Sequence, residues 1–329
     1  MVATTIATRR AALRLGAAAP AALALAGRRA AAQPAGFPNR PVRIVVPYTP
    51  GGVSDITARL MAEPLAAAWG HPVPVENRPG ADGVIGTEAV ARAAPDGHTL
   101  ALVSVGHAVN PAFYRLPFDT MRDFSFVTQT TSTPLVLCAA RGFAAGTPAE
   151  LVEHAKKNPG VTFAGTGGVV RLAPVLFAQR AGVELSYVPY RGSTQAHPDL
   201  IAGRVDIMFD TVPAALPHIQ SGALKALATT GARRAPQLPD TPTIGEAFMP
   251  GFEASTWGTV IAPANLPAPV LARLNADCVA ALRRPEVVDR HRALGAEVVT
   301  STPEEMRRFC QAEMEKWGEA ARRADIRPQ

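Results

Sequence analysis

Two glycine-rich segments have the composition of an anion-binding turn. They are Val46 to Asp55 (V-P-Y-T-P-G-G-V-S-D) and Phe163 to Gly168 (F-A-G-T-G-G), and each joins a strand-like run to a helical pattern. Glycine allows a sharp turn and exposes backbone N–H groups. The first N–H groups of a helix lack internal partners and carry partial positive charge. Two such turns can hold one anion without Lys or Arg, although each alone also fits an ordinary tight connection.

The remaining polar residues do not form a catalytic pattern. None of the seven histidines pairs with another at the i, i+4 spacing of a helical metal site. Ser104 has Leu102 where a nucleophile elbow requires its first glycine, and the turn at Gly51 lacks the Lys-Ser/Thr of a P-loop. His107, just beyond the strand that ends at Ser104, is the one histidine expected near a pocket. We therefore predict no catalytic residue, metal ion or cofactor; the alternative, an exported hydrolase of small acids, would need an activated nucleophile or a metal.

The three cysteines, Cys138, Cys278 and Cys310, are assigned no chemistry. An odd count leaves at least one unpaired in an oxidising compartment, and their spacing does not resemble a metal site. Cys310 stands in a helical pattern beside Phe309, where a buried thiol is expected.

The basic charge of the chain belongs to its first 32 residues. The 329 residues carry a net charge of +6, but this segment has five arginines and no acidic residue. Its apolar stretch from Leu15 to Ala26 is too short to span a membrane and leads to Ala30-Ala31-Ala32, which offers a signal-peptidase site near Ala32. Thr8 to Arg14 fits a twin-arginine signal, with an ordinary secretory signal as the alternative. The mature chain is then nearly neutral, which argues against nucleic acid as a partner and predicts a soluble periplasmic protein.

Strands and helices alternate along the rest of the chain, which predicts an α/β fold with a parallel-rich sheet. A helix is predicted from Ser54, with a kink or break at Pro64. Thr147 and Thr302 are each followed three residues later by Glu, which predicts capping boxes. The expected strands are 42–46, 73–75, 99–104, 134–138, 162–164, 205–209 and 224–229.

Six motifs together resemble the solute receptors of the tripartite tricarboxylate transporter family, the TctC or Bug proteins. They span nearly the whole mature chain: Pro50–Asp55, Glu76–Gly83, Pro95–Leu100, Pro189–Gly192, Asp199–Asp206 and Leu238–Thr243. The resemblance implies a two-domain periplasmic-binding-protein fold (type II), in which each domain is a mixed, mostly parallel sheet flanked by helices and the ligand binds in the interdomain cleft. It places one domain at 37–137 plus 258–329 and the other at 138–257, with hinge strands near Cys138 and Trp257.

The resemblance also implies a ligand site for a small organic carboxylate held between the two glycine-rich loops. Asp55 is expected to shape and cap the first loop rather than face the ligand. The residues expected at the site come from both loops, from the strand end at Ser104 and from further loops: Tyr48, Thr49, Gly51, Gly52, Ser54, Asp55, Ser104, His107, Gly165, Thr166, Gly167, Gly168, Tyr190, Arg191 and Asp210.

Two residues depart from the family pattern, in which a serine is usual at Gly168 and a histidine at Arg171. Arg171 is interpreted as a surface residue, with a cation near the pocket as the alternative. The function implied is a monomeric receptor that delivers its carboxylate to a membrane permease. A sensory receptor that docks on a membrane sensor is the alternative with the same ligand chemistry.

Overall fold

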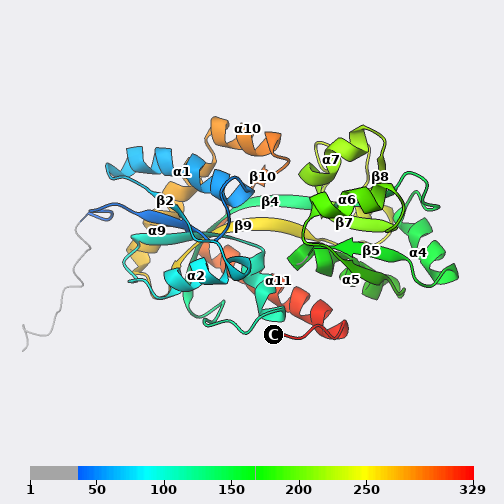
Figure 1. Cartoon of the computed structure of the whole chain (residues 1–329). Coiled ribbons are helices and arrows are strands. Elements are labelled where there is room, and N and C mark those ends of the chain that lie inside the picture. Colours follow the sequence, from blue (N-terminus) through cyan, green and yellow to red (C-terminus); the bar gives the residue numbers. More distant parts are fainter. Residues whose placement is uncertain (1–35, 167) are drawn as a thin grey trace, which may run out of the picture. The chain divides into compact units, whose positions relative to one another are not determined.

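The computed structural model describes residues 36–166 and 168–329 (Figure 1). The predicted leader and Gly167 lie outside these ranges. The strands are β1 (Arg43–Val46), β2 (Val75–Asn77), β3 (Thr99–Ser104), β4 (Phe124–Ala140), β5 (Thr162–Gly165), β6 (Ser186–Pro189), β7 (Ile207–Thr211), β8 (Leu224–Thr229), β9 (Ser255–Pro263) and β10 (Glu297–Val298). The helices are α1 (Val53–Trp69), α2 (Val84–Ala91), α3 (Gly106–Val109), α4 (Pro148–Lys157), α5 (Gly168–Ala181), α6 (Ser193–Ile201), α7 (Val212–Gln220), α8 (Ile244–Ala247), α9 (Ala268–Leu282), α10 (Pro285–Ala293) and α11 (Pro303–Arg323), with 3-10 turns η1 (Ala81–Gly83) and η2 (Asn110–Ala112).

The strands follow the order β2-β1-β3-β9-β4-β7-β5-β6, and β10 and β8 also pair with β4. We call β2, β1, β3, β9 and β10 with the first part of β4 the N-sheet, and the second part of β4 with β7, β5, β6 and β8 the C-sheet. The pairs β1–β2, β1–β3, β5–β6 and β5–β7 are parallel, whereas every partner of β4 is antiparallel to it. In Figure 1, β4 and β9 run side by side through the middle of the described structure.

Strand β4 links the two sheets because its partners change along its length. Residues Phe124 to Pro134 pair with β9, and pairing with β7 begins at Leu135. The strand has 17 residues, far more than the expected 134–138. Its first half is rich in Ser and Thr, so it lacks the apolar run from which a strand would be predicted. The β-branched threonines there are nevertheless mostly buried, and they favour a strand. The strand thus passes from one sheet to the other at Pro134, and the domain boundaries stay a prediction.

Both faces of the C-sheet are covered, which explains why its strands read as continuous apolar runs. Along β4, Leu135 and Leu137 pack into a cluster that also contains side chains of α5 and α11. The alternate residues, Val136 and Cys138, pack on the other face with α6 and α7. A strand that is buried on both faces does not show the alternation of apolar and polar residues that is typical of a half-exposed strand.

Helix α1 is continuous through Pro64, so the predicted break is wrong. It runs for 17 residues, and its buried positions Met61, Leu65 and Trp69 continue one face past the proline. The Trp69 indole N–H donates to Asp277 of α9 at 2.6 Å. Packing of this face outweighs the loss of one intrahelical hydrogen bond.

The two expected capping boxes are confirmed to different degrees. Thr302 caps α11 in a complete box with Glu305. Thr147 caps α4 by accepting from the Glu150 N–H, but the Glu150 carboxylate accepts from Gly146 instead of closing the box.

All three cysteines are buried and free of disulfide bonds. Burial raises the pKa of Cys278 and Cys310 to about 12, so these thiols stay protonated and unreactive at neutral pH. Within residues 36–166 and 168–329, the helices are each too short or too polar to cross a bilayer.

Candidate functional site

The first glycine-rich turn lies between β1 and α1 and is closed by Asp55. Gly51 has φ of +90°, which favours glycine, and Gly52 is the N-cap of α1. The Asp55 side chain is 4% exposed; it accepts hydrogen bonds from the Gly51 N–H at 2.9 Å, from Asn77 Nδ2 at 2.9 Å and from Arg59 Nε at 3.0 Å. Burial by itself would raise the pKa of Asp55, but these donors outweigh it and hold the pKa below its usual value. Asp55 therefore fixes the shape of the turn as an anion.

This network corrects one expectation about the first turn. The Gly51 N–H is bonded to Asp55 and is not free for a ligand. The first N–H groups of α1, including that of Ser54, remain, since no side chain in the described part of the molecule caps this helix end. Thr49 and Gly52 are exposed and Ser54 is partly buried. The turn offers its helix end, rather than its glycine amide, to an anion.

Tyr48 and Ser104 meet where two parallel strands end. Tyr48 follows β1, and Ser104 is the last residue of β3. These two strands are parallel neighbours, so their carboxyl ends lie at the same edge of the N-sheet. The Ser104 N–H donates to the Tyr48 hydroxyl at 3.0 Å, and the Ser104 hydroxyl donates to it at 2.8 Å. Burial raises the pKa of Tyr48, so its hydroxyl stays protonated. The pair joins the first turn to the start of α3.

His107 is buried in the core and lines none of the three main cavities among the described residues, which argues against the pocket position that the sequence suggested. Its side chain is 4% exposed, its ring packs edge-on against Phe124 with centroids 5.0 Å apart, and its Nε2 lies 3.2 Å from the Thr120 carbonyl oxygen. Burial lowers its pKa to about 4, so the imidazole is neutral at pH 7. The apolar face of α3 carries His107 into the core, a direction that the position after Ser104 did not reveal.

The second turn joins β5 to α5 and has a different construction. Gly165 is buried, and a Cβ there would lie 2.7 Å from Cε2 of Tyr187, so any larger residue would have to displace that ring. Gly168 opens α5 with φ of +51°, and Thr166 is partly buried. Gly167 lies outside the described residues. The Tyr190 N–H donates to the Gly165 carbonyl at 3.0 Å, which holds the next strand end against this turn.

The sequence interpretation placed Arg171 on the surface, and the structure corrects this. Arg171 is partly buried in the first half of α5, and its guanidinium carbon lies 4.4 Å from the ring centroid of Tyr187 and 5.5 Å from that of Phe113. Phe113 comes from the segment after η2, before the chain enters β4. Tyr187 and Phe113 were both missed at the sequence level because neither stands in a motif.

Asp210 is present at its strand end, but its carboxylate is fully used within the protein. It is 1% exposed and accepts from the Ser193 hydroxyl and the Thr211 N–H, each at 2.8 Å. His197 Nε2 lies 2.8 Å from its other oxygen. Asp210 thus orients the start of α6, and Ser193 and His197 are the partners that sequence reasoning missed.

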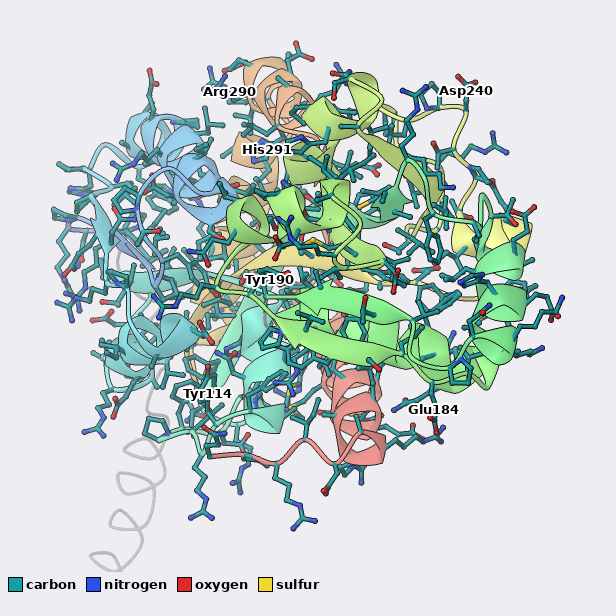
Figure 2. All side chains as sticks on the ribbon, turned by 45° about the vertical axis from the view of Figure 1, so that its right-hand side comes forward. Tyr114, Glu184, Tyr190, Asp240, Arg290 and His291 are labelled. Carbon is teal, nitrogen blue, oxygen red and sulfur yellow. The ribbon has the colours of Figure 1, made fainter. Side chains whose placement is uncertain are left out.

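Tyr190 and Arg191 border the same end of the C-sheet. The Tyr190 hydroxyl donates to Asp199 at 2.7 Å, and burial together with this carboxylate raises the pKa of Tyr190 to about 12. Arg191 is exposed. Figure 2 labels Tyr190 where the chain leaves β6.

A cavity of about 820 Å³ lies away from both turns and is lined by residues of β4, the 231–237 loop, β10 and α11. Its cations are largely neutralised: Arg233 pairs with Glu297 at 2.7 Å, and Lys316 pairs with Glu313. None of the sequence-predicted site residues lines it. Paired cations have little capacity left for an added anion, so the turns are the better candidates. The described residues also contain no cluster of side chains that could hold a metal ion.

A family model described as tripartite tricarboxylate transporter family receptor (TctC) matches residues 57–325. The chain is 41% identical over 286 residues to the UPF0065 protein in the tcbD-tcbE intergenic region of Pseudomonas sp. (strain P51), covering 85% of each chain.

Solved structures of similar proteins give the same fold. "R. palustris Rpa4515 with adipate" is 34% identical with a TM-score of 0.73, over 89% of this chain and 100% of that one. "MatC (Rpa3494) from Rhodopseudomonas palustris with bound malate" is 33% identical with a TM-score of 0.70, over 87% of this chain and 100% of that one. Together with the mixed sheet and its flanking helices, these likenesses show the two-domain binding-protein fold.

Proposed function

Since the chain belongs to the tripartite tricarboxylate transporter receptor family, we propose that it is an exported, monomeric receptor for a small organic carboxylate. The bound carboxylate is delivered to a membrane permease. Its similarity to structures with adipate and with malate supports this class of ligand. The export signal belongs to the proposal, because residues 1–32 lie outside the described structure.

The pairing of two strand–turn–helix units carries the proposal. The turns after β1 and β5 both stand at the carboxyl ends of parallel strands, where α/β proteins bind their ligands. At the first, the backbone N–H groups at the start of α1 donate to one carboxylate oxygen. At the second, the backbone N–H groups at the start of α5 donate to the other oxygen, so the anion is bound largely by backbone donors.

Closure between the two domains is the proposed mechanism. The domains are 37–137 plus 258–329 and 138–257, joined by β4 and β9. The ligand contacts one turn from each, so it binds the closed form better than the open form and shifts the population toward it. The permease recognises the closed form.

Calorimetry and thermal unfolding of the chain from residue 33 onward test the proposal. We expect at least one mono-, di- or tricarboxylate to raise the melting temperature, because a ligand at 100 times its Kd stabilises by about 2.7 kcal/mol. For a chain of this size that is roughly 4 °C. Stabilisation by nucleotides or sugars, and by no carboxylate, would overturn it.

A further inference from the structure

Arg171 is a cation whose charge is not compensated by any side chain within residues 36–166 and 168–329. Its guanidinium is partly buried over the ring of Tyr187 at 4.4 Å, with Phe113 at 5.5 Å. Among the described residues, none accepts a hydrogen bond from it and no carboxylate forms an ion pair with it. The first turn of α5 has no acidic residue. Arg59, at the other turn, is by contrast paired with Asp55 at 2.9 Å.

The aromatic contacts orient this cation without using its donors. A guanidinium that stacks on a ring interacts through its flat face, and its N–H groups lie in its plane and point away from the ring. A partly desolvated cation without a counter-ion is unfavourable, and a carboxylate that binds it in a bidentate way removes that cost. The guanidinium that lies over the Tyr187 ring is therefore held ready for an external carboxylate.

Arg171 is also part of the second turn rather than a neighbour of it. A Cβ on Gly165 would lie 3.4 Å from the Arg171 Cα and 2.7 Å from the Tyr187 ring. Tyr187 thus contacts both the turn and the guanidinium. An anion held at the start of α5 and an anion held by Arg171 can be two ends of one ligand.

We infer that Arg171 is a specificity-determining residue that binds a second carboxylate, so that this receptor selects dicarboxylates over monocarboxylates of the same chain length. The inference rests on the proposed function, because it assumes that the first carboxylate binds at the glycine-rich turns. It assigns a binding role to a side chain that departs from the family pattern.

Matched ligand pairs test it: succinate against butyrate and adipate against hexanoate, each titrated by calorimetry. We expect the wild-type protein to bind one dicarboxylate at least tenfold more tightly than its monocarboxylate partner. In Arg171→Gln, which keeps a planar group but loses the charge, dicarboxylate affinity falls tenfold or more while monocarboxylate affinity changes less than threefold. Arg171→Lys, which keeps the charge, retains part of the preference.

Arg180→Gln is the matched control, since Arg180 also lies over an aromatic ring, that of Phe252 at 5.7 Å, but in the last turn of the same helix. It should leave both affinities unchanged. An unchanged ratio in Arg171→Gln, an equal loss for both ligand classes or a wild type without preference would each overturn the inference. If the Gln variant unfolds, Arg171→Lys tests the inference through a partial loss of the dicarboxylate preference, and an unchanged preference in this variant would overturn it. If the wild type binds no carboxylate at all, the proposed function itself fails.

Discussion

The two glycine-rich turns share a strand–turn–helix plan but differ in charge. The first carries the buried acid Asp55, which accepts the Gly51 N–H and is surrounded by Asn77 and Arg59. The second has no acid in the first turn of its helix and carries Arg171 instead. The first turn pairs its charges internally, whereas Arg171 at the second has no counter-ion in the part of the chain that the structure describes.

The difference shows how similar sequence motifs can have unequal roles. A turn whose donors are already bonded is rigid and gives the site its shape. A turn with an uncompensated cation supplies attraction and selectivity. Substitutions at the first turn should therefore change stability most, and those at the second should change ligand choice.

Removal of the Asp55 carboxylate should have the largest effect. Asp55→Ala leaves the Gly51 N–H and the Asn77 amide without their acceptor, and we expect a loss of about 3 kcal/mol in the free energy of unfolding. Affinity for a carboxylate should fall at least tenfold because the turn must then be ordered on binding. Urea unfolding and calorimetry measure the two effects.

Asp289→Ala is the control, because Asp289 forms an exposed ion pair with Arg292 on α10. It should change stability by less than about 0.5 kcal/mol. If the two alanine variants were equally stable, the first turn would not depend on its internal acid, and the contrast between the turns would disappear.

The folded protein should lose stability as pH falls, because His107 is buried as a neutral imidazole in the part of the structure that carries the first turn. Its pKa is about 4 in the folded protein against about 6.5 in an unfolded chain. As pH falls from 6.5 toward 4, the unfolded chain takes up a proton that the folded protein does not, so stability decreases; by pH 5 the loss is about 2 kcal/mol. The pKa of His291 is also lowered by burial and adds a loss of the same sign.

His107→Gln keeps a donor for the Thr120 carbonyl but cannot titrate. We expect its free energy of unfolding, measured by urea at pH 8 and pH 5, to fall by about 2 kcal/mol less than that of the wild type. His71→Gln, at a partly exposed position, is the control. An unchanged pH dependence in His107→Gln would show that this imidazole is not the neutral core residue described above.

The same Gly-to-Ser substitution should have opposite, smaller effects at the two turns. Gly168 has φ of +51°, so Gly168→Ser is strained and should cost about 1 kcal/mol. Gly52 has φ of −77° at an N-cap position that lacks a side-chain cap, so Gly52→Ser should stabilise by a few tenths of a kcal/mol. Thermal unfolding distinguishes them, and a destabilised Gly52→Ser would contradict the backbone geometry of the first turn.

The sequence predicted both turns, the strands at 99–104 and 224–229, and the cap at Thr302, because these features depend on local chemistry. Glycines at a turn, apolar runs and a threonine three residues before a glutamate act over a few residues. The family resemblance then supplied the fold, which the comparisons confirm.

Contacts between distant segments could only come from the tertiary structure. Pro64 stays within α1 because the helix packs on α9. His107 is buried because residues 118–126 enclose its ring. Whether Arg171 faces solvent or two aromatic rings depends on Tyr187 and Phe113, which lie 16 residues after it and 58 residues before it in the chain. Local sequence determined that a turn forms, and packing decided which of its groups remain available to a ligand.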